Sequence, residues 1–380
     1  MEKNMFIVEN NTVTSVRIGI IGVGVMGSGH AEYLLTGQVE NAILTCLCDI
    51  DSKKFIKFAN TYPKLQCYTD YKQMITSGNV DAVIIATPHY FHPEMAIFAF
   101  EHGMHVISEK PMGVEAGNVM RMNQAAIESG KVFSSMFCVR TDPNFRKIRE
   151  MIMDGSLGKI KRVTWIKTDW YRPQAYHDSA DWRSSWRTEG GGMLINQSPH
   201  NLDMIQWFFG MPDEITSQVS FGKYYDIEVE DEVIVHLHYK DFICTYISST
   251  GEYPGSDRLE IACEMGQLVF ENGKICFRKT DISEREFNKS NRDPNARPGI
   301  QEIYVEPLQG MMHHKYITQN FVNAILNGEE LIAPGLNGLN EVEICNGIYM
   351  SAWTGKTVSL PVCQDDFCNL LQQKIKESEK

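Results

Sequence analysis

The sequence has no excess of basic charge, and this excludes one broad class of partner. Its 380 residues include 36 Lys and Arg against 48 Asp and Glu, which gives a net charge of -12 at pH 7 and a pI of about 5.4. No block of basic residues stands out from this pattern. Proteins that bind nucleic-acid phosphates carry such a block. We therefore expect no nucleic-acid partner.

Long apolar runs are also missing. A helix that crosses a membrane needs about 18 or more apolar residues in a row, and no segment approaches that length. Residues 1–15 are polar and lack the apolar centre of a secretory signal. We expect no membrane partner and a cytoplasmic location.

The cysteines and histidines lack the spacing of a metal site. There are ten cysteines but no Cys-x-x-Cys pair, and Cys46 and Cys48 face opposite sides of an expected strand. The same lack of ligand spacing holds for His89, His92, His200 and His314. We expect free thiols in a reducing compartment and no metal.

The first pattern that carries chemistry is a glycine-rich turn. A strand-like run, residues 16–21, leads into Gly22-Val23-Gly24-Val25-Met26-Gly27, and a helical pattern follows. In such a turn the first glycine permits the tight bend, the second lets the backbone approach a pyrophosphate, and the third lets helix and strand pack closely. The helix N-terminus offers N–H groups to the anion. The residues expected to bind a dinucleotide here are Gly22, Gly24, Val25, Met26 and Gly27.

Asp49 ends the next expected strand, residues 42–48. It follows Gly27 by 22 residues (49 − 27), the distance at which an acid binds an adenosine ribose. Its carboxylate would repel a 2′-phosphate, so we expect NAD rather than NADP, although Lys53 and Lys54 would weaken that preference. The alternative is that Asp49 caps a helix that starts near Ser52.

Two further strands end in polar residues. Residues 82–86 lead into Thr87-Pro88-His89, and residues 105–108 lead into Glu109-Lys110-Pro111. Ligands of an open parallel sheet bind outside the carboxyl ends of its strands, so Lys110 would point into that crevice while Pro111 restricts its backbone. The alternative is a Lys-Pro turn on the surface. Helices alternate with these strands, and we expect a doubly wound, six-stranded Rossmann domain over residues 14–137.

In the second half an amphipathic helix over residues 142–154 and a strand over residues 161–171 precede an aromatic loop and a further helix. Residues 172–189 include Trp182 and Arg183, and a loop so rich in aromatic residues is expected to cover a site. Gly190-Gly191-Gly192 then opens an expected helix to about Phe209, bent at Pro199. On this helix Asn196, His200 and Asp203 share one face.

His200 is open to two interpretations. A single histidine on a helix is often structural, but this one follows three glycines and shares a face with Asn196. An ordinary histidine titrates near neutral pH and suits a general base. We therefore interpret His200 as catalytic, Asn196 as a substrate-binding residue and Asp203 as structural.

From residue 214 the apolar pattern changes to a period of two, which predicts a mainly antiparallel sheet. Residues 280–300 are polar and predict an excursion or a lid. We expect an α+β domain over residues 138–362 that binds substrate and supplies an open sheet, and a charged C-terminal tail over residues 363–380.

The motifs at 22–27, 87–92 (Thr-Pro-His-Tyr-Phe-His) and 109–111 together resemble the glucose–fructose oxidoreductase and inositol dehydrogenase family (Gfo/Idh/MocA). The resemblance covers nearly the whole chain, and Glu-Lys-Pro is its more specific part. It implies cofactor contacts from Thr87, Pro88, His89, His92, Glu109 and Lys110, and a homo-oligomer, dimer or tetramer, formed through the open sheet. In the family an aspartate stands four residues before the histidine, whereas this chain has Asn196, and an amide cannot carry charge or relay a proton.

The resemblance implies an NAD-dependent oxidoreductase that transfers a hydride between NAD and a hydroxyl of a sugar, sugar derivative or cyclitol. His200 would be the base, Lys110 would hydrogen-bond the same oxygen, and Trp182, Arg183 and Asn196 would contact the substrate. A redox-neutral glycosidase or lyase that retains NAD and acts through a transient keto-sugar would use the same residues. A non-catalytic NAD sensor would have no need of both Lys110 and His200.

Overall fold

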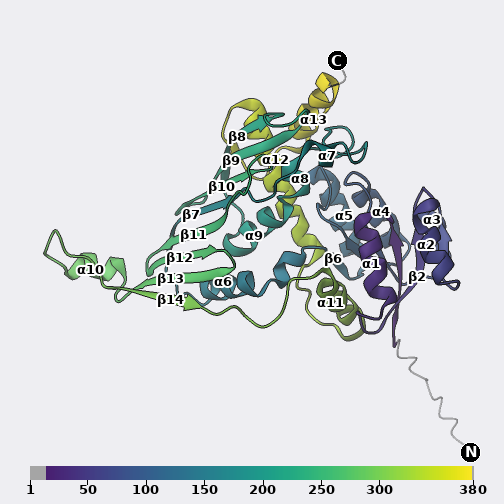
Figure 1. The fold of residues 1–380 in the computed structure, drawn as a ribbon, viewed down its shortest axis with the longest axis horizontal. Helices are drawn as coiled ribbons and strands as arrows, with labels where there is room; N and C mark the ends of the chain where they lie inside the picture. The colour runs from purple at the N-terminus through teal and green to yellow at the C-terminus, as the bar shows by residue number, and fades with distance from the viewer. Residues whose placement is uncertain (1–13, 379–380) are drawn as a thin grey trace, which may run out of the picture.

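A computed structural model describes residues 14–378, which form two sheets joined by helices (Figure 1). Most of the polar N-terminal stretch and the last two residues of the expected tail lie outside this range. Sheet A has six parallel strands in the order β3-β2-β1-β4-β5-β6, the doubly wound order expected for a dinucleotide-binding domain. Its strands are β1 Val16–Ile21, β2 Ala42–Cys48, β3 Gln66–Tyr68, β4 Ala82–Ile85, β5 His105–Ser108 and β6 Phe133–Ser135. The sequence pattern had not identified the edge strand β3.

Sheet A is covered by helices on both faces. These helices are α1 Val25–Leu35, α2 Lys53–Thr61, α3 Tyr71–Thr76, α4 Phe91–Glu101 and α5 Ala116–Ser129. The strand β4 shows why both faces are apolar: Ala82 and Ile84 enter one core, while Val83 and Ile85 enter the other. Successive side chains of a strand point to opposite faces, so a strand buried on both sides has no polar position.

Sheet B has nine strands in the order β14-β13-β12-β11-β7-β10-β9-β8-β15. Only β7 and β10 pair in parallel, so the prediction of a mainly antiparallel sheet is confirmed. Its strands are β7 Ile160–Lys167, β8 Glu214–Phe221, β9 Glu230–His238, β10 Ile243–Ser249, β11 Asp257–Cys263, β12 Gly266–Glu271, β13 Lys274–Thr280, β14 Ile300–Val305 and β15 Val358–Ser359. One face packs on helices, and Val233, Val235 and Leu237 show the alternation that this requires.

The helices of the second half are two 3₁₀ helices, η1 Cys138–Thr141 and η2 Gly335–Asn337, and a set of α-helices: α6 Pro143–Met153, α7 Gln174–His177, α8 Met193–Asn196, α9 Pro199–Phe209, α10 Glu284–Ser290, α11 His314–Asn327, α12 Gly338–Thr354 and α13 Gln364–Ser378. Helix α11 returns to the first half, where Ile317 and Phe321 enter a core of sheet A. Helix α12 contributes to both halves, with Val342 in a core of sheet A and Ile344 in the core of sheet B. These two helices join the halves into one packed unit.

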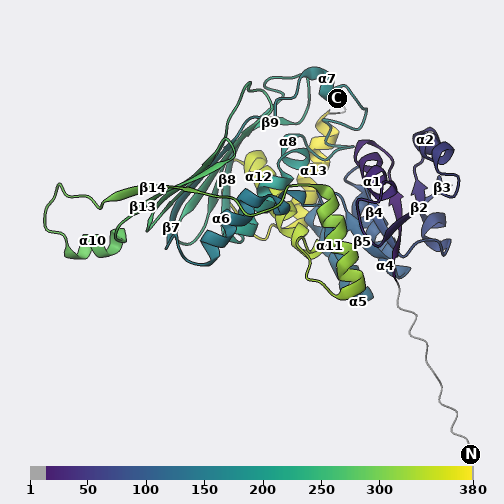
Figure 2. The ribbon, with the colours of Figure 1, turned by 60° about the horizontal axis from the view of Figure 1, so that its bottom comes forward.

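Three expectations need correction or refinement. The single helix expected over residues 190–209 is two helices, because Pro199 has no N–H to continue a ladder and instead starts α9. The segment 280–300 is an excursion and not a lid: it carries α10 and projects from the far end of sheet B, away from sheet A (Figures 1 and 2). The C-terminal tail is the helix α13, whose Phe367 and Leu371 are buried in the core of sheet B.

Among the helices of residues 14–378, none has the length and apolar character needed to cross a membrane.

Candidate functional site

The glycine loop lies between β1 and α1, and each of its three glycines has a physical reason. Gly22 has φ +90°, and a Cβ there would lie 2.5 Å from the Ala86 carbonyl oxygen. A Cβ on Gly27 would overlap the Gly22 carbonyl, so this glycine lets α1 approach β1. A Cβ on Gly24 would meet nothing within 4 Å. The open space at Gly24, at the N-terminus of α1, fits a bound pyrophosphate.

Asp49 faces this loop. Its Oδ2 accepts a hydrogen bond from the Val23 N–H at 2.8 Å, and its Oδ1 accepts one from the Asp51 N–H at 3.0 Å. Helix α2 starts only after Ser52, so the alternative that Asp49 caps a helix is wrong. The carboxylate therefore lies beside the turn where a dinucleotide ribose would lie.

Exposed apolar side chains flank Asp49 and the glycine loop. Ile50 is 94% exposed, Val25 86% and Met26 38%. Exposed apolar side chains at the carboxyl ends of parallel strands are typical of a ligand-binding surface. The residues present thus fit a nucleotide cofactor in both the polar and the apolar parts of the site.

The loops after β4 and β5 are tied together by His92. This residue is fully buried, with one ring nitrogen 2.7 Å from the Thr87 carbonyl oxygen and the other 2.7 Å from the Pro111 carbonyl oxygen. Pro88 contributes a carbonyl that accepts from the Phe91 N–H. Both ring nitrogens of His92 are thus engaged by the backbone rather than available to a ligand. His92 holds the loops after β4 and β5 in a fixed position relative to each other.

Glu109 holds the loop after β5, which carries Lys110, against helix α1. Its Oε1 lies 2.8 Å from Nε2 of His30 on α1, and His30 in turn contacts the Tyr33 hydroxyl. Burial alone would raise the pKa of Glu109, but the hydrogen bond and charge of His30, with nearby His314 and Lys110, lower it to about 2. An ionised Glu109 faces α1 rather than solvent, so it positions the backbone of Lys110.

Lys110 reaches across from sheet A to the second half of the chain. Its Nζ donates to the Asn196 carbonyl oxygen, at the end of α8, at 2.6 Å. Burial lowers the pKa of this half-buried amine below its ordinary value, although Glu109 and other acids oppose the shift. The surface-turn alternative is therefore wrong, because Lys110 sits where the two halves meet.

His200 lies in the first turn of α9, near Lys110. Burial, with the positive charge of Lys110, lowers the pKa of His200 to about 3. The expectation of an ordinary histidine that titrates near neutral pH is therefore wrong, because the ring is desolvated. Its Nδ1 is buried and has no hydrogen-bond partner within residues 14–378. A buried nitrogen without a partner is costly, and a bound hydroxyl would satisfy it.

Asn196 contacts a residue that the sequence pattern had not singled out. Its amide Nδ2 donates to Oε1 of Glu189. Glu189 is 2% exposed, and its carbonyl lies 3.0 Å from Nδ1 of His89. An acid directly before three glycines, where the backbone comes close to other groups, was the available signal.

The aromatic loop, residues 172–189, lies on one side of the candidate site, next to His89. The Trp182 ring lies edge-on to the His89 ring at 5.7 Å, and the Arg183 guanidinium lies 4.5 Å from the centre of the Trp182 ring. The Arg183 side chain also donates to the Tyr176 hydroxyl at 2.8 Å. Trp186, by contrast, is buried against Tyr349 and belongs to the core.

Asp203 is structural, as predicted. Both its oxygens accept from the Arg140 guanidinium, at 2.6 and 2.9 Å, and both side chains are buried. This pair fixes α9, which carries His200, to η1 after β6.

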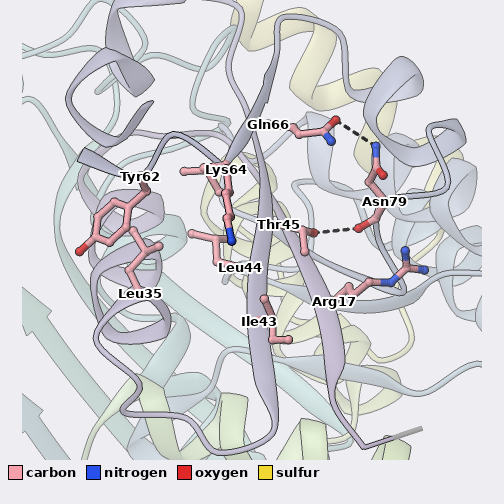
Figure 3. A pocket seen from close by; sticks show the side chains of 10 residues that line it. Arg17, Leu35, Ile43, Leu44, Thr45, Tyr62, Lys64, Gln66 and Asn79 are labelled. Atoms are coloured by element: carbon pink, nitrogen blue, oxygen red, sulfur yellow. Dashed lines mark hydrogen bonds between the residues drawn. The ribbon is translucent and has the colours of Figure 1, made fainter. Parts of the chain in front are cut away.

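A separate hollow of about 310 Å³ lies at the opposite edge of sheet A (Figure 3). Arg17, Ile43 and Thr45 place it near the amino ends of β1 and β2, whereas ligands of such sheets bind at the carboxyl ends. It is distinct from the site at Lys110. Within residues 14–378 no group of three or more His, Cys, Asp or Glu side chains is placed to hold a metal ion.

Known proteins resemble both halves. Residues 16–137 match the oxidoreductase family with an NAD-binding Rossmann fold, and residues 145–269 match the GFO/IDH/MocA C-terminal domain. The myo-inositol 2-dehydrogenase of Thermotoga maritima is 25% identical over 268 residues, which cover 68% of this chain and 75% of that protein. Matches to several further relatives span about half of their lengths.

Solved structures share the fold across both domains. The WlbA dehydrogenase of Bordetella pertussis, in complex with NADH and UDP-GlcNAcA, has a TM-score of 0.76 at 24% identity and covers 92% of this chain and 100% of its own. A levoglucosan dehydrogenase in complex with NADH and levoglucosan has a TM-score of 0.76 at 20% identity, with 91% and 100% covered. The two family matches, to the N-terminal and to the C-terminal domain, together cover more than half of the chain. The chain therefore belongs to the Gfo/Idh/MocA family of oxidoreductases, whose N-terminal domain is an NAD-binding Rossmann fold.

Proposed function

We propose that this protein oxidises a hydroxyl group of a sugar, sugar derivative or cyclitol with NAD. The observation that carries the proposal is the contact of Lys110 with Asn196, because it joins the carboxyl edge of the nucleotide-binding sheet to the two short helices that carry Asn196 and His200. The names of the similar proteins, inositol and levoglucosan dehydrogenases among them, support this substrate class.

Each residue of the candidate site has a separate role in the proposed oxidation. Bound NAD supplies the hydride acceptor. Lys110, with its lowered pKa, and His200, with its unpartnered Nδ1, are the two groups that can accept a hydrogen bond or a proton from the substrate hydroxyl. Asn196 binds a neighbouring hydroxyl, and Trp182 and Arg183 limit the space around the ring.

A panel of inositols, free sugars and glycosides with NAD tests the proposal, with NADH formation followed by absorbance. We expect one or a few compounds to give NADH in proportion to the oxidised product. Product without net NADH would instead identify the redox-neutral glycosidase or lyase. No turnover of any hydroxyl compound would contradict the proposal.

Asp49 sets the cofactor preference in this proposal. We expect wild-type protein to use NAD in preference to NADP, because the Asp49 carboxylate repels a 2′-phosphate. Asp49→Ser should reduce kcat/KM with NAD and make the preference for NAD over NADP smaller. Without the Asp49 carboxylate, the exposed Lys53 and Lys54 would attract the 2′-phosphate of NADP with no opposing charge. Asp51→Ser is the matched control, and equal use of both cofactors by the wild type would contradict the assignment.

We propose a cytoplasmic, homo-oligomeric protein with a domain boundary near residue 137. All ten cysteines are free, which suits a reducing compartment. The outer face of sheet B carries exposed apolar side chains such as Ile243 and Tyr304, which suits contact with a second copy. Sedimentation velocity measures the oligomeric state directly.

A further inference from the structure

Glu189 is buried and has no part in the mechanism above, yet its carboxylate contacts two segments of the site and its main-chain carbonyl contacts a third. Its Oε1 accepts from the Asn196 amide at the end of α8, and its Oε2 accepts from the Ser184 N–H in the aromatic loop. Its own carbonyl lies 3.0 Å from Nδ1 of His89, in the loop after β4. A carboxylate on the surface would make neither of the two side-chain contacts.

Position 196 is where the chain departs from its family pattern, and Glu189 lies next to that departure. An asparagine carries no charge, so the negative charge expected at this point is missing from position 196. The Glu189 carboxylate accepts a hydrogen bond from the Asn196 amide, so it places a negative charge directly beside that side chain.

Two cations and two histidines lie around Glu189, and burial lowers the pKa of both histidines, so they are neutral near neutral pH. Arg183 and Lys110 act on the carboxylate from the aromatic loop and from the end of β5, and His89 faces its carbonyl. His177 contacts Ser184 through its hydroxyl at 2.6 Å. Burial outweighs these charges and the hydrogen bonds and raises the pKa of Glu189 to about 7, whereas the pKa of His200 is about 3. Of these two, only Glu189 changes charge near neutral pH.

We propose that Glu189 is a positioning residue whose carboxylate supplies the negative charge that Asn196 lacks and fixes the orientation of the Asn196 amide. With Nδ2 held by Glu189, the amide Oδ1 remains as an acceptor for a substrate hydroxyl. This inference rests on the proposed alcohol oxidation. In that reaction the C–H hydrogen leaves with its electron pair to NAD, the O–H proton passes to Lys110 or His200, and a carbonyl forms. Glu189 forms no bond and stabilises the positive charge that the proton creates.

The selected substrate therefore carries a second hydroxyl beside the one that is oxidised, because Asn196 presents an acceptor and not a donor. A compound in which that neighbouring hydroxyl is replaced by hydrogen should lose more kcat/KM in the wild type than in Glu189→Gln.

The decisive experiment moves the carboxylate. Glu189→Gln should lower kcat/KM for oxidation by about 10- to 100-fold, the usual effect of losing a hydrogen bond to a charged group, and should flatten its pH dependence near pH 7. Asn196→Asp in the Glu189→Gln background returns a carboxylate to the site and should recover most of the rate. Asp181→Asn, an exposed acid of the same loop, should stay within two-fold of wild type.

A second measurement needs neither NAD nor substrate. The ordinary pKa of a glutamate is 4.5, and that of Glu189 is raised to about 7. As pH rises through this window the unfolded chain loses the proton first, so the folded state loses stability. The melting temperature of the wild type should therefore fall more than that of Glu189→Gln between pH 5 and pH 8.

The outcomes separate the two ideas. If the wild type oxidises no hydroxyl compound, the proposed function fails and this inference fails with it. If the wild type is active but Glu189→Gln keeps its rate and pH profile, only this inference is overturned. An equal loss at every pH with no recovery in the double variant would make Glu189 merely structural and would also overturn it.

Discussion

Lys110→Ala is expected to slow the oxidation by about 10²- to 10⁴-fold, the usual contribution of a general acid–base group. The lysine amine lies at the end of β5 and donates to the Asn196 carbonyl at 2.6 Å, so its removal deletes the group and the bridge between the halves together. The affinity for NADH, measured by fluorescence titration, should stay within a few-fold of wild type, because the substitution leaves the glycine loop and Asp49 in place.

Two further variants make this result specific. Lys110→Arg keeps a positive charge but cannot lose a proton, so it should be nearly as slow as Lys110→Ala if the amine exchanges a proton. Lys274→Ala removes the same charge from an exposed position on β13 and should keep the wild-type rate. A Lys110→Ala rate within a few-fold of wild type would leave the lysine a structural role only.

The nucleotide-binding half was predictable because its signals are local. A strand, three glycines and an acid at a fixed distance lie close in sequence, and the structure places β1, β2 and β5 at the residues expected. The short edge strand β3 escaped notice because three residues are too few to show an alternating pattern.

The substrate side was less predictable because burial is a tertiary property. The place of His200 on a helix follows from the sequence pattern, but its pKa depends on how much water the surrounding helices exclude. Glu189 was missed for a related reason. Seven residues separate it from Asn196, and only the sharp path of the chain through Gly190, Gly191 and Gly192 brings the two side chains together.

The same limit applies to α11. Its sequence follows the strands of sheet B, yet Ile317 and Phe321 pack into a core of sheet A. A division of the chain into successive domains cannot anticipate a helix that returns to the first domain. The outcome matters for function, because α11 also places Thr318 against Tyr33, which contacts the His30 that holds Glu109.

The largest loss of stability is expected from Asp203→Ala. Breaking one side of a buried ion pair leaves an uncompensated charge and typically costs about 3–5 kcal/mol of unfolding free energy. Arg140 is 1% exposed; it would lose its carboxylate partner and keep the hydrogen bonds to the Ile332 carbonyl and the Asn337 side chain. Urea unfolding followed by fluorescence measures the difference.

The chain offers a matched control for this prediction in Arg17 and Asp81. That pair has the same two-pronged geometry, with contacts of 2.6 and 3.0 Å, but both side chains are at least one-third exposed. Asp81→Ala should therefore cost about 1 kcal/mol or less. If both substitutions cost the same, burial is not what makes the Arg140–Asp203 pair important.

Replacing both partners separates the penalty of an unpaired charge from the value of the pair itself. Arg140→Met combined with Asp203→Leu removes both charges, and apolar replacements of buried ion pairs are often close to neutral in stability. We expect the double variant to be more stable than Asp203→Ala. It should nevertheless be slower in oxidation, because the pair ties α9, and with it His200, to the segment that follows β6. A double variant with full stability and full activity would show that the pair neither anchors the fold nor positions the histidine.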